Sequence, residues 1–551
     1  MYGSDADIKV EIRSNNTGRV NRVAYEGVVP RFNRLYLNRD ISKLKKSLQD
    51  EISALISEQV CDECGGIGLN KNALASRING LNIAELSRLN VNELLRELGR
   101  IDDPVGSALS RQICEKLERM IAVGIGYLSL DRRSDTLSGG EAQRVKMVRN
   151  LGSSLSNITY IFDEPTAGLH PHDASKIGQI LLNLRDNHNN ILVIEHNTQM
   201  IKLADHIVEL GEFGGSGGGR IIYEGDLAGL QKRDSKTAKA LNEGVQINQN
   251  PLKFSEVFAI KNATRNNLKN VSVDIPKGVL VAISGVAGSG KSSLMDEFMA
   301  HYPQAIKIDQ KAIGAQNRST PATYTGVMDE IRKLFAKANG VDAGWFSPNS
   351  KGACKACKGS GVISYDMAFA EPVVLTCEEC GGKRYSDEAL KFCYSGLNIE
   401  QAVSQSIDEA VEFFNDKKIA RLLGALRDVG LGYLSLNQPT STLSGGENQR
   451  VKLASMLGKS GEIYVLDEPS TGLSESDSKE LLKLLRRLVD AKNSVIIIEH
   501  RLSLIACADF VIDMGEGAGN EGGEVIFAGT PSELLECVRS KTARYLKELV
   551  E

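Results

Sequence analysis

The strongest constraint on the fold of this 551-residue chain is an internal repeat. The phrase "TLSGGEAQR" at 136–144 returns as "TLSGGENQR" at 442–450. Flanking stretches return with it, since "DEPTAGL" after 162 is echoed by "DEPSTGL" after 466, and "IEH" at 194–196 by "IEH" at 498–500. So regular a spacing indicates duplication of a whole domain. The length also exceeds one hydrophobic core, and we expect about three or four domains.

A glycine-rich loop, "GVAGSGKS" at 285–292, occurs only once in the sequence. It follows the apolar "GVLVAIS" and precedes the helical "SSLMDEFMA", which is the strand–loop–helix context of a phosphate-binding loop. In such a loop backbone N–H groups surround the phosphates, Lys291 neutralises their oxygens and Ser292 can ligate Mg²⁺. A mate of Lys291 at the repeat spacing would precede residue 1. We therefore expect one complete copy and one partial copy.

Paired carboxylates end a predicted buried strand in each copy, at "IYVLDEPS" and "YIFDEPTA". In the second copy Asp467 would hold the Mg²⁺ shell, and Glu468 would act as general base toward the attacking water. Asp163 and Glu164 are the first-copy versions. A solvated strand end is the alternative, which the duplication disfavours. His196 and His500 end further apolar strands, where ligands collect, and their matched positions predict γ-phosphate sensors.

The repeated Leu-Ser-Gly-Gly-Glu opens a predicted helix, whose N-terminal N–H groups and dipole favour an anion. With the phosphate loop and the paired carboxylates, it predicts an α/β P-loop ATPase that uses ATP and Mg²⁺.

Six of the ten cysteines lie in three Cys-x-x-Cys pairs, which favours metal over disulfides in a long chain without a leader. The pairs at 354–357 and 377–380 have four-thiolate zinc spacing, and the stretch between them can form a β-hairpin. Buried free cysteines are the alternative. The third pair, Cys61 and Cys64, has no companion pair, so zinc there needs ligands from elsewhere. The predicted Zn²⁺ ligands are Cys354, Cys357, Cys377 and Cys380.

Composition limits the classes of partner. The formal net charge is −4, so any nucleic-acid surface must be a local patch. The N-terminus has no apolar leader and no apolar run is long enough for a membrane span, so we expect a cytoplasmic protein with no membrane partner. Basic residues around the zinc module could contact a phosphate backbone, or could be solvated charge. These are Lys355, Lys358, Lys383 and Arg384.

The signature and phosphate-loop motifs together resemble the ATP-binding-cassette family. The resemblance implies that the signature of one cassette completes the nucleotide site of the other. One composite site would then be complete and its mirror incomplete, because the mirror has no phosphate loop. The complete site would comprise Gly285, Gly288, Gly290, Lys291, Ser292, Ser293, Gln310, Asp467, Glu468 and His500 with Ser138, Gly139 and Gly140. The incomplete site would comprise Asp163, Glu164 and His196 with Ser444, Gly445 and Gly446.

The zinc module between phosphate loop and signature, with "GACKACKGSGVI", "CEECGGKRY" and "NRSTPATYTGVMDEIRKLFA", closely resembles the UvrA family of bacterial nucleotide excision repair. "YEGVVPRFNRLY" at 25–36 is also similar to that family. The resemblance implies an ATPase without nuclease activity of its own, which dimerises and binds damaged double-stranded DNA. Gln310 matches the family's Q-loop glutamine and Arg318 a DNA-facing arginine.

Departures from the family pattern modify these expectations. The first phosphate loop and the inserts that bind DNA and the UvrB-type helicase are missing, so we do not expect the chain alone to load that helicase. Ala315 replaces a second arginine, "AFAEP" at 368–372 replaces the hairpin pattern, and Ala287 and Ser293 replace a serine and a threonine. A separate N-terminal polypeptide could supply the missing half.

Other functions stay open at this point: a drug-tolerance paralogue within the family, or a zinc- and ATP-dependent DNA-binding fragment that does not hydrolyse ATP. A transporter ATPase is disfavoured by the zinc module. The expected domains are 1–100, a remnant of the first signature-domain insertion; 101–241, the first cassette without its phosphate loop; 242–254, a linker; 255–340, the second nucleotide-binding core; 341–440, the zinc-bearing insertion; and 441–551, the rest of the second cassette.

Overall fold

A computed structural model describes residues 9–13, 20–24, 27–37, 48, 51–52, 55–56, 59–137, 139–150, 156–211, 218–309, 319–365, 373–457 and 460–550. The chain forms two compact units, residues 1–76 and 77–551. Residues 77–100 pack in the second unit, where Leu86, Val91 and Leu94 share a core cluster with Leu117. None of the described helices is long and apolar enough to cross a membrane.

The unit formed by residues 1–76 contains short elements. Near its start, β1 (Lys9–Arg13) pairs antiparallel with β2 (Val20–Ala24). Helix α1 (Val28–Phe32) continues into a π-helical turn, η1 (Asn33–Leu37), and α3 spans Lys71–Ala75. The stretch "ISKLKKSLQDEISALISEQ" at 41–59, whose sequence predicts a helix, lies largely outside the described residues.

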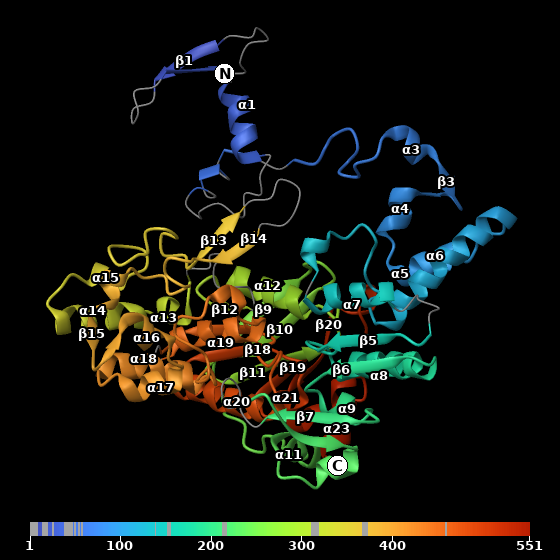
Figure 1. The fold of residues 1–551 in the computed structure, drawn as a ribbon. Coiled ribbons are helices and arrows are strands. Elements are labelled where there is room, and N and C mark those ends of the chain that lie inside the picture. The colour runs from blue at the N-terminus through green and yellow to red at the C-terminus, as the bar shows by residue number, and fades with distance from the viewer. Residues whose placement is uncertain are drawn as a thin grey trace. The chain divides into compact units, whose positions relative to one another are not determined.

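The second copy is built on a six-stranded sheet in the order β12–β17–β18–β11–β19–β20 (Figure 1). Neighbouring strands are parallel except β19 and β20, which are antiparallel. Such a sheet needs cover on both faces, which explains its continuous apolar runs. The strands are β11 (Leu280–Gly285), β12 (Ile306–Ile308), β17 (Ile463–Asp467), β18 (Ser494–Ile498), β19 (Phe510–Gly515) and β20 (Glu524–Gly529).

Alternating side chains of β11 divide the core between the two faces of this sheet. Leu280 and Ala282 belong to one cluster, whereas Val281 and Ile283 belong to the other. The second cluster also holds Phe298 of α12 and residues of the antiparallel pair β9–β10. The flanking elements are β9 (Val257–Ala263), β10 (Val271–Pro276), α12 (Lys291–His301), α20 (Glu475–Asp490), α21 (Leu502–Ala506), α22 (Pro531–Leu534) and α23 (Lys541–Val550).

The signature region of the second copy extends the larger core cluster. Phe335, Phe346 and Phe414 are fully buried there. The cysteine-bearing segment emerges from this region as a hairpin of β13 (Val362–Tyr365) and β14 (Val373–Thr376), as expected from the sequence. The remaining elements are α13 (Pro321–Tyr324), α14 (Val327–Asn339), η5 (Ala343–Phe346), α15 (Asp387–Leu390), β15 (Cys393–Tyr394), β16 (Leu397–Asn398), α16 (Ile399–Ser404), α17 (Ile407–Phe413), α18 (Lys417–Asp428), η6 (Thr440–Thr442) and α19 (Gly445–Met456).

The first copy repeats only part of this arrangement among the described residues. Strand β5 (Thr159–Asp163) pairs parallel with β6 (Asn190–Ile194), and β7 (Ile207–Gly211) pairs antiparallel with β8 (Arg220–Gly225), as two separate sheets. They correspond to β17–β18 and β19–β20, which β11 joins in the second copy. Its other elements are β3 (Arg77–Ile78), β4 (Leu81–Asn82), α4 (Ile83–Arg88), α5 (Val91–Leu98), α6 (Pro104–Ala122), η3 (Ser134–Thr136), α7 (Gly139–Asn150), α8 (Pro171–Asp186), α9 (Thr198–Ile201), α10 (Leu227–Gln231) and α11 (Lys236–Asn242).

Apolar side chains of β6 and β7 are exposed where the second copy buries its own. Leu192 and Ile194 on β6 are 55% and 51% exposed, and Leu210 on β7 is 66% exposed. Their repeat mates, Ile496, Ile498 and Met514, are at most 1% exposed because β11 lies between β18 and β19. The described strands of the first copy therefore expose apolar edges that their counterparts in the second copy bury.

Candidate functional site

The phosphate loop links β11 to α12 through glycines in left-handed conformations. Gly285, Gly288 and Gly290 have φ of +132°, +76° and +107°, which residues with a Cβ rarely adopt. A Cβ at Gly285 would also lie 2.2 Å from the carbonyl oxygen of Met514. The Lys291 Nζ donates hydrogen bonds to the carbonyls of Gly285 (2.8 Å) and Val286 (2.9 Å). Burial lowers the pKa of Lys291 to about 8, although the charges of the nearby carboxylates act to raise it.

The paired carboxylates of the second copy follow β17 at the carboxyl edge of the sheet. Burial raises the pKa of Asp467 above its ordinary value. Burial, together with the neighbouring Asp467 charge, raises the pKa of Glu468 to about 7. His500 follows β18, and its Nε2 lies 3.7 Å from the Glu468 Oε1. Because burial lowers the pKa of His500 well below its ordinary value, the imidazole faces this carboxyl group in its neutral form.

The first copy contributes directly to this centre. Gly168 has φ of +65°, and a Cβ there would lie 2.4 Å from the Glu468 Oε2. The Asp173 Oδ2 accepts a hydrogen bond from the backbone N–H of Ala287 in the phosphate loop, at 3.3 Å. The Tyr127 ring lies where a Cβ of Gly288 would approach it to 2.9 Å. The centre is therefore composite, with the phosphate loop from one copy covered by loops of the other.

His170 of the first copy extends this contact to the last helix of the chain. It is fully buried, and its Nε2 lies 3.1 Å from the Thr542 Oγ1 on α23. Thr542 donates in turn to Asp513, which also accepts from Ser284 on β11. The His170 ring lies edge-on to that of His500, with centroids 6.1 Å apart. A buried polar network thus ties the first copy to the strand that carries the phosphate loop.

Other predicted residues of the complete centre occupy varied positions. Ser292 is exposed, whereas the Ser293 hydroxyl accepts from Asn266 (3.1 Å) and donates to Asn267 (3.4 Å). Gly139 and Gly140 begin α7. Ser138, Gln310 and Arg318 lie outside the described residues, as do Ala315 and 368–372.

The mirror centre has a glutamate and a histidine at the equivalent positions, but the pKa values of the two residues are shifted in the opposite directions. The His196 Nε2 lies 3.3 Å from the Glu164 Oε1. This hydrogen bond lowers the pKa of Glu164 and raises that of His196, the reverse of Glu468 and His500. The two histidines differ in burial, since the His196 side chain is 44% exposed and that of His500 only 7%. Asp163 ends β5, while Ser444 caps α19 at its start, followed by Gly445 and Gly446.

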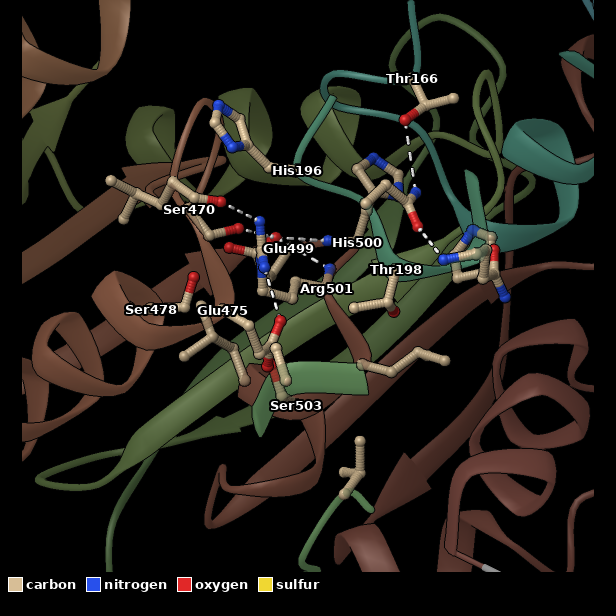
Figure 2. A pocket seen from close by; sticks show the side chains of 18 of the residues that line it. Thr166, His196, Thr198, Ser470, Glu475, Ser478, Glu499, His500, Arg501 and Ser503 are labelled. Atoms are coloured by element: carbon tan, nitrogen blue, oxygen red, sulfur yellow. Dashed lines mark hydrogen bonds and ion pairs between the residues drawn. The ribbon is translucent and has the colours of Figure 1, made fainter. Parts of the chain in front are cut away.

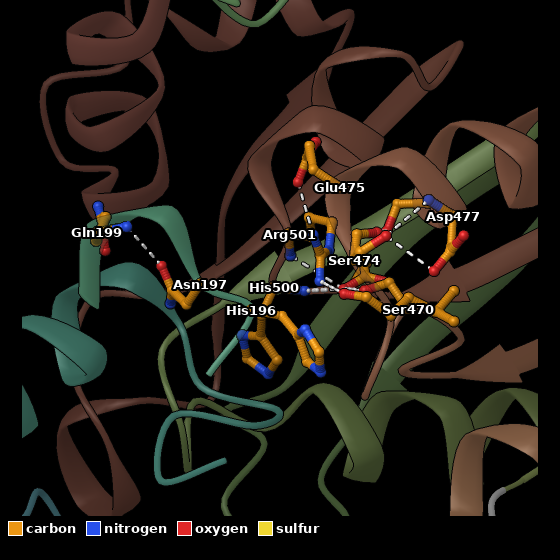
Figure 3. Close-up of polar contacts among 12 residues, drawn as sticks. His196, Asn197, Gln199, Ser470, Ser474, Glu475, Asp477, His500 and Arg501 are labelled. Atoms are coloured by element: carbon orange, nitrogen blue, oxygen red, sulfur yellow. Dashed lines mark hydrogen bonds and ion pairs between the residues drawn. The ribbon is translucent and has the colours of Figure 1, made fainter. Parts of the chain in front are cut away.

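A cavity of about 630 Å³ lies between the two copies, lined by 166–169 and 195–199 of the first and by 470–473 and 499–504 of the second (Figure 2). The buried Glu499 carboxylate accepts from the Ser470 hydroxyl (2.8 Å) and the backbone N–H of His500 (2.8 Å). Arg501 pairs with Glu475 at 2.6 Å (Figure 3). These bonds hold the loop after Glu468 against the loop that carries His500.

The four predicted zinc ligands lie together. All four sulfurs are within 4.8 Å of one another and belong to buried residues. The Cys354 and Cys377 sulfurs are 4.0 Å apart, and those of Cys357 and Cys380 are 3.7 Å apart. A tetrahedral ion with Zn–S bonds of about 2.3 Å places its sulfurs about 3.8 Å apart, so the cluster fits Zn²⁺.

The basic residues near this cluster differ in their surroundings. Lys355, Lys358 and Lys383 are exposed. Arg384 is half-buried, and its Nε donates to the carbonyl of Gly359 at 3.1 Å. Arg384 therefore links the two cysteine turns, a structural role that the sequence pattern did not predict.

Reasoning from the sequence also missed Tyr127, Gly168 and His170. The echoed "GYLSL" could have indicated Tyr127, because its mate Tyr433 makes the equivalent hydrogen bond: each hydroxyl donates to a glutamate of its signature helix, Glu141 or Glu447. His170 has no such signal, since Ser474 stands at its repeat position.

Comparisons with known proteins agree with this geometry. Residues 268–471 match the ABC transporter family model. The solved structure of UvrA2 from Deinococcus radiodurans superposes with a TM-score of 0.89 at 34% identity, covering 99% of this chain and 74% of that one. The chain belongs to the UvrA family. UvrABC system protein A of Aquifex aeolicus is 41% identical over 96% of this chain and 61% of its own length. UvrABC system protein A of Clostridium perfringens is 39% identical over 100% of this chain and 62% of its own length.

This UvrA-family chain thus spans about three fifths of the length of the curated relatives it matches. The fold expected from the sequence, an α/β P-loop ATPase of the ATP-binding-cassette type, is confirmed. The four-cysteine cluster expected within it is also present.

Proposed function

We propose that this UvrA-family chain hydrolyses ATP at the composite centre and couples turnover to binding of damaged duplex DNA, with no nuclease activity of its own. The observation that carries the ATPase part is the approach of Gly168 in the first copy to Glu468 in the second. Because of this contact, the position of the general base depends on how the two copies meet. Any ligand that changes their arrangement can therefore change turnover.

Each residue of the centre has a defined task in this proposal. Lys291 binds the β- and γ-phosphates, and Glu468 accepts the proton of the water that attacks the γ-phosphate. His500 orients the γ-phosphate as a neutral hydrogen-bonding group. Ser292 and Asp467 would hold Mg²⁺, which neutralises phosphate charge when bound. Ser138, Gly139 and Gly140 would bind the γ-phosphate from the opposite copy through the α7 N-terminus.

The DNA part of the proposal rests on the family and on local charge. Relatives are named as component A of the UvrABC system. The exposed Lys355, Lys358 and Lys383 surround the four-cysteine cluster beside the β13–β14 hairpin. Lysines in such a position can neutralise backbone phosphates although the whole chain is slightly acidic. The zinc would hold the two cysteine turns, and thereby the lysines, in place.

A separate N-terminal polypeptide could supply a strand and a phosphate loop equivalent to residues 280–292. Its strand would pack against the exposed edges of β6 and β7. In the second copy that strand covers the equivalent side chains. Such a partner would complete the mirror centre, where Glu164 and His196 already lie side by side.

ATP hydrolysis by the purified, zinc-loaded chain tests the proposed function. We expect turnover that rises when damaged duplex DNA is added and that disappears in the Lys291→Ala variant. Lys291 lies within the phosphate loop, so its loss removes the charge that holds the phosphates. Absence of turnover in a folded wild-type chain would contradict the ATPase, and turnover indifferent to damaged DNA would contradict the coupling.

The pH dependence of kcat/KM gives a second test, because this constant reports ionisations of the free enzyme. Glu468 must be deprotonated to accept a proton, so kcat/KM should rise as the pH passes through about 7. Lys291 must be protonated to bind phosphate, so kcat/KM should fall as the pH passes about 8. A bell-shaped profile is therefore expected, and Glu164→Gln should retain it. A flat profile across this interval would rule out Glu468 as the base.

A further inference from the structure

Tyr127 of the first copy lies directly on the phosphate loop of the second. A Cβ at Gly288 would come within 2.9 to 3.0 Å of three atoms of the Tyr127 ring. A Cβ at Gly519, in the loop that follows β19, would lie 3.1 Å from the Tyr127 Cβ. The backbone N–H of Gly519 also donates to the carbonyl of Gly288 at 3.0 Å. The tyrosine therefore packs against two glycines that are hydrogen-bonded to each other.

The hydroxyl group of Tyr127 connects this contact to the signature helix of its own copy. It donates to the Glu141 Oε1 at 2.6 Å. Glu141 ends the phrase Leu-Ser-Gly-Gly-Glu, lies in the first turn of α7 and is buried. Burial raises the pKa of Tyr127 above its ordinary value, so the hydroxyl keeps its proton and is the donor. Hydrogen bonds to a carboxylate are among the strong ones. One side chain thus links the start of α7 in the first copy to the phosphate loop of the second.

The backbone around Tyr127 is bound to helix α5. The N–H of Val91 donates to the carbonyl of Leu128 at 2.9 Å. In the same turn of α5, the Glu93 Oε1 accepts a hydrogen bond from the Asn520 Nδ2 at 3.3 Å, in the loop that contacts Tyr127. The tyrosine is therefore held on a helix that itself contacts the second copy.

The second copy repeats the tyrosine and its support. Tyr433 donates to Glu447 in the first turn of α19, and the N–H of Ile407 donates to the carbonyl of Leu434 at 2.9 Å. Tyr433 is 39% exposed, however, whereas Tyr127 is half-buried. The contact with the phosphate loop at 285–292 belongs to Tyr127, so Tyr433 provides a matched comparison.

We propose that Tyr127 is a positioning residue that fixes the distance between the start of α7 and the phosphate loop, and thereby determines how strongly the centre prefers a nucleoside triphosphate over a diphosphate. The inference rests on the proposed function, in which Gly139 and Gly140 bind the γ-phosphate at the start of α7. A diphosphate needs only the phosphate loop, whose backbone surrounds the α- and β-phosphates. A triphosphate must contact the loop and the helix at once, so its affinity depends on their separation.

The affinities of the full chain for two magnesium-bound nucleotides test the inference: ADP and the non-hydrolysable triphosphate analogue adenylyl imidodiphosphate. Tyr127→Phe keeps the ring but removes the hydroxyl group. It should bind the analogue roughly 10-fold more weakly, the order of effect of losing one hydrogen bond to a charged group, and bind ADP as the wild type does. Tyr433→Phe should match the wild type for both nucleotides.

Glu141→Gln weakens the same bond from its other end. It should also lower the affinity for the analogue and leave that for ADP unchanged. If the tyrosine acts through Glu141, the loss in the double variant Tyr127→Phe/Glu141→Gln should be smaller than the product of the two single losses. A loss equal to that product would overturn the inference.

Three further results would contradict this role for Tyr127: an unchanged affinity of Tyr127→Phe for the analogue, an equal loss for ADP in both single variants, or the same loss in Tyr433→Phe. Because these affinities need no hydrolysis, the proposed function fails separately. A wild-type chain with the expected affinities but no turnover would contradict the ATPase and support the inference. A chain that hydrolyses ATP, while Tyr127→Phe keeps its affinity for the analogue, would contradict the inference alone.

Discussion

Replacing Glu468 with Gln should lower the rate of ATP hydrolysis by about 100- to 10,000-fold, the range that a positioned general base contributes. The amide keeps the shape of the side chain but cannot accept the proton of the attacking water. Glu468 is suited to this task because burial and Asp467 raise the pKa of its carboxyl group to about 7. Single-turnover hydrolysis measures the effect, and ATP binding should be retained.

The matched control is Glu164→Gln in the mirror centre. Glu164 occupies the same place after its strand and has the same strained backbone, with φ of +43° against +48° for Glu468. The hydrogen bond from His196 lowers its pKa, however, and no phosphate loop of the first copy is present in the sequence. Turnover of the Glu164→Gln chain should stay close to that of the wild type. Equal losses in the two variants would mean that hydrolysis does not occur at the centre of Lys291 and Glu468.

Replacing Gly168 with Ala should lower kcat by about 100-fold, which is the order of effect that a misplacement of about 1 Å has on catalysis. The added methyl group would lie 2.4 Å from the Glu468 Oε2, so the carboxylate must move away. Gly168 belongs to the first copy and Glu468 to the second. The loss would therefore show that the first copy controls the catalytic base of the other.

Gly472→Ala separates this effect from backbone strain. Gly472 is the repeat mate of Gly168 and has φ of +71° against +65°, so both alanine variants carry about the same conformational cost of 1–2 kcal/mol. At Gly472, however, the nearest atom to the new methyl group is the Glu164 Oε2 at 3.7 Å, an ordinary contact. The two variants should show similar losses of thermal stability, while only Gly168→Ala loses turnover. A comparable loss in both would assign the effect to strain.

Features set by a short stretch of chain could be predicted from the sequence. The phosphate loop was predictable because glycine spacing and the flanking apolar run are local, and β11 and α12 have the expected order. The four-cysteine cluster was predictable because sulfur ligands need a fixed spacing, and the hairpin between its two halves follows from that. The partial first copy was predictable from the single phosphate loop in the sequence, and among the described residues no strand equivalent to β11 joins β6 to β7.

Features that depend on how distant segments meet could not be predicted. Nothing near Gly168 in the sequence indicates that it faces a glutamate 300 residues later. Arg384 appeared as one more surface charge, yet its guanidinium reaches the carbonyl of Gly359. Ser293 follows the phosphate-loop motif directly, but the helix turns its hydroxyl toward Asn266 and Asn267. The type of a residue and its position in the sequence do not specify which distant residue it will contact.

The bond between His170 and Thr542 has a consequence for biosynthesis. The two residues are separated by 372 positions, and Ser175 meets Tyr545 over a similar span. At a translation rate of about 5–20 residues per second, roughly 20 to 75 s pass between synthesis of His170 and of its partner. During this interval the first copy lacks the helix that buries His170. The hydrogen bonds that tie His170 through Thr542 and Asp513 to the strand of the phosphate loop can therefore form only after α23 has been synthesised.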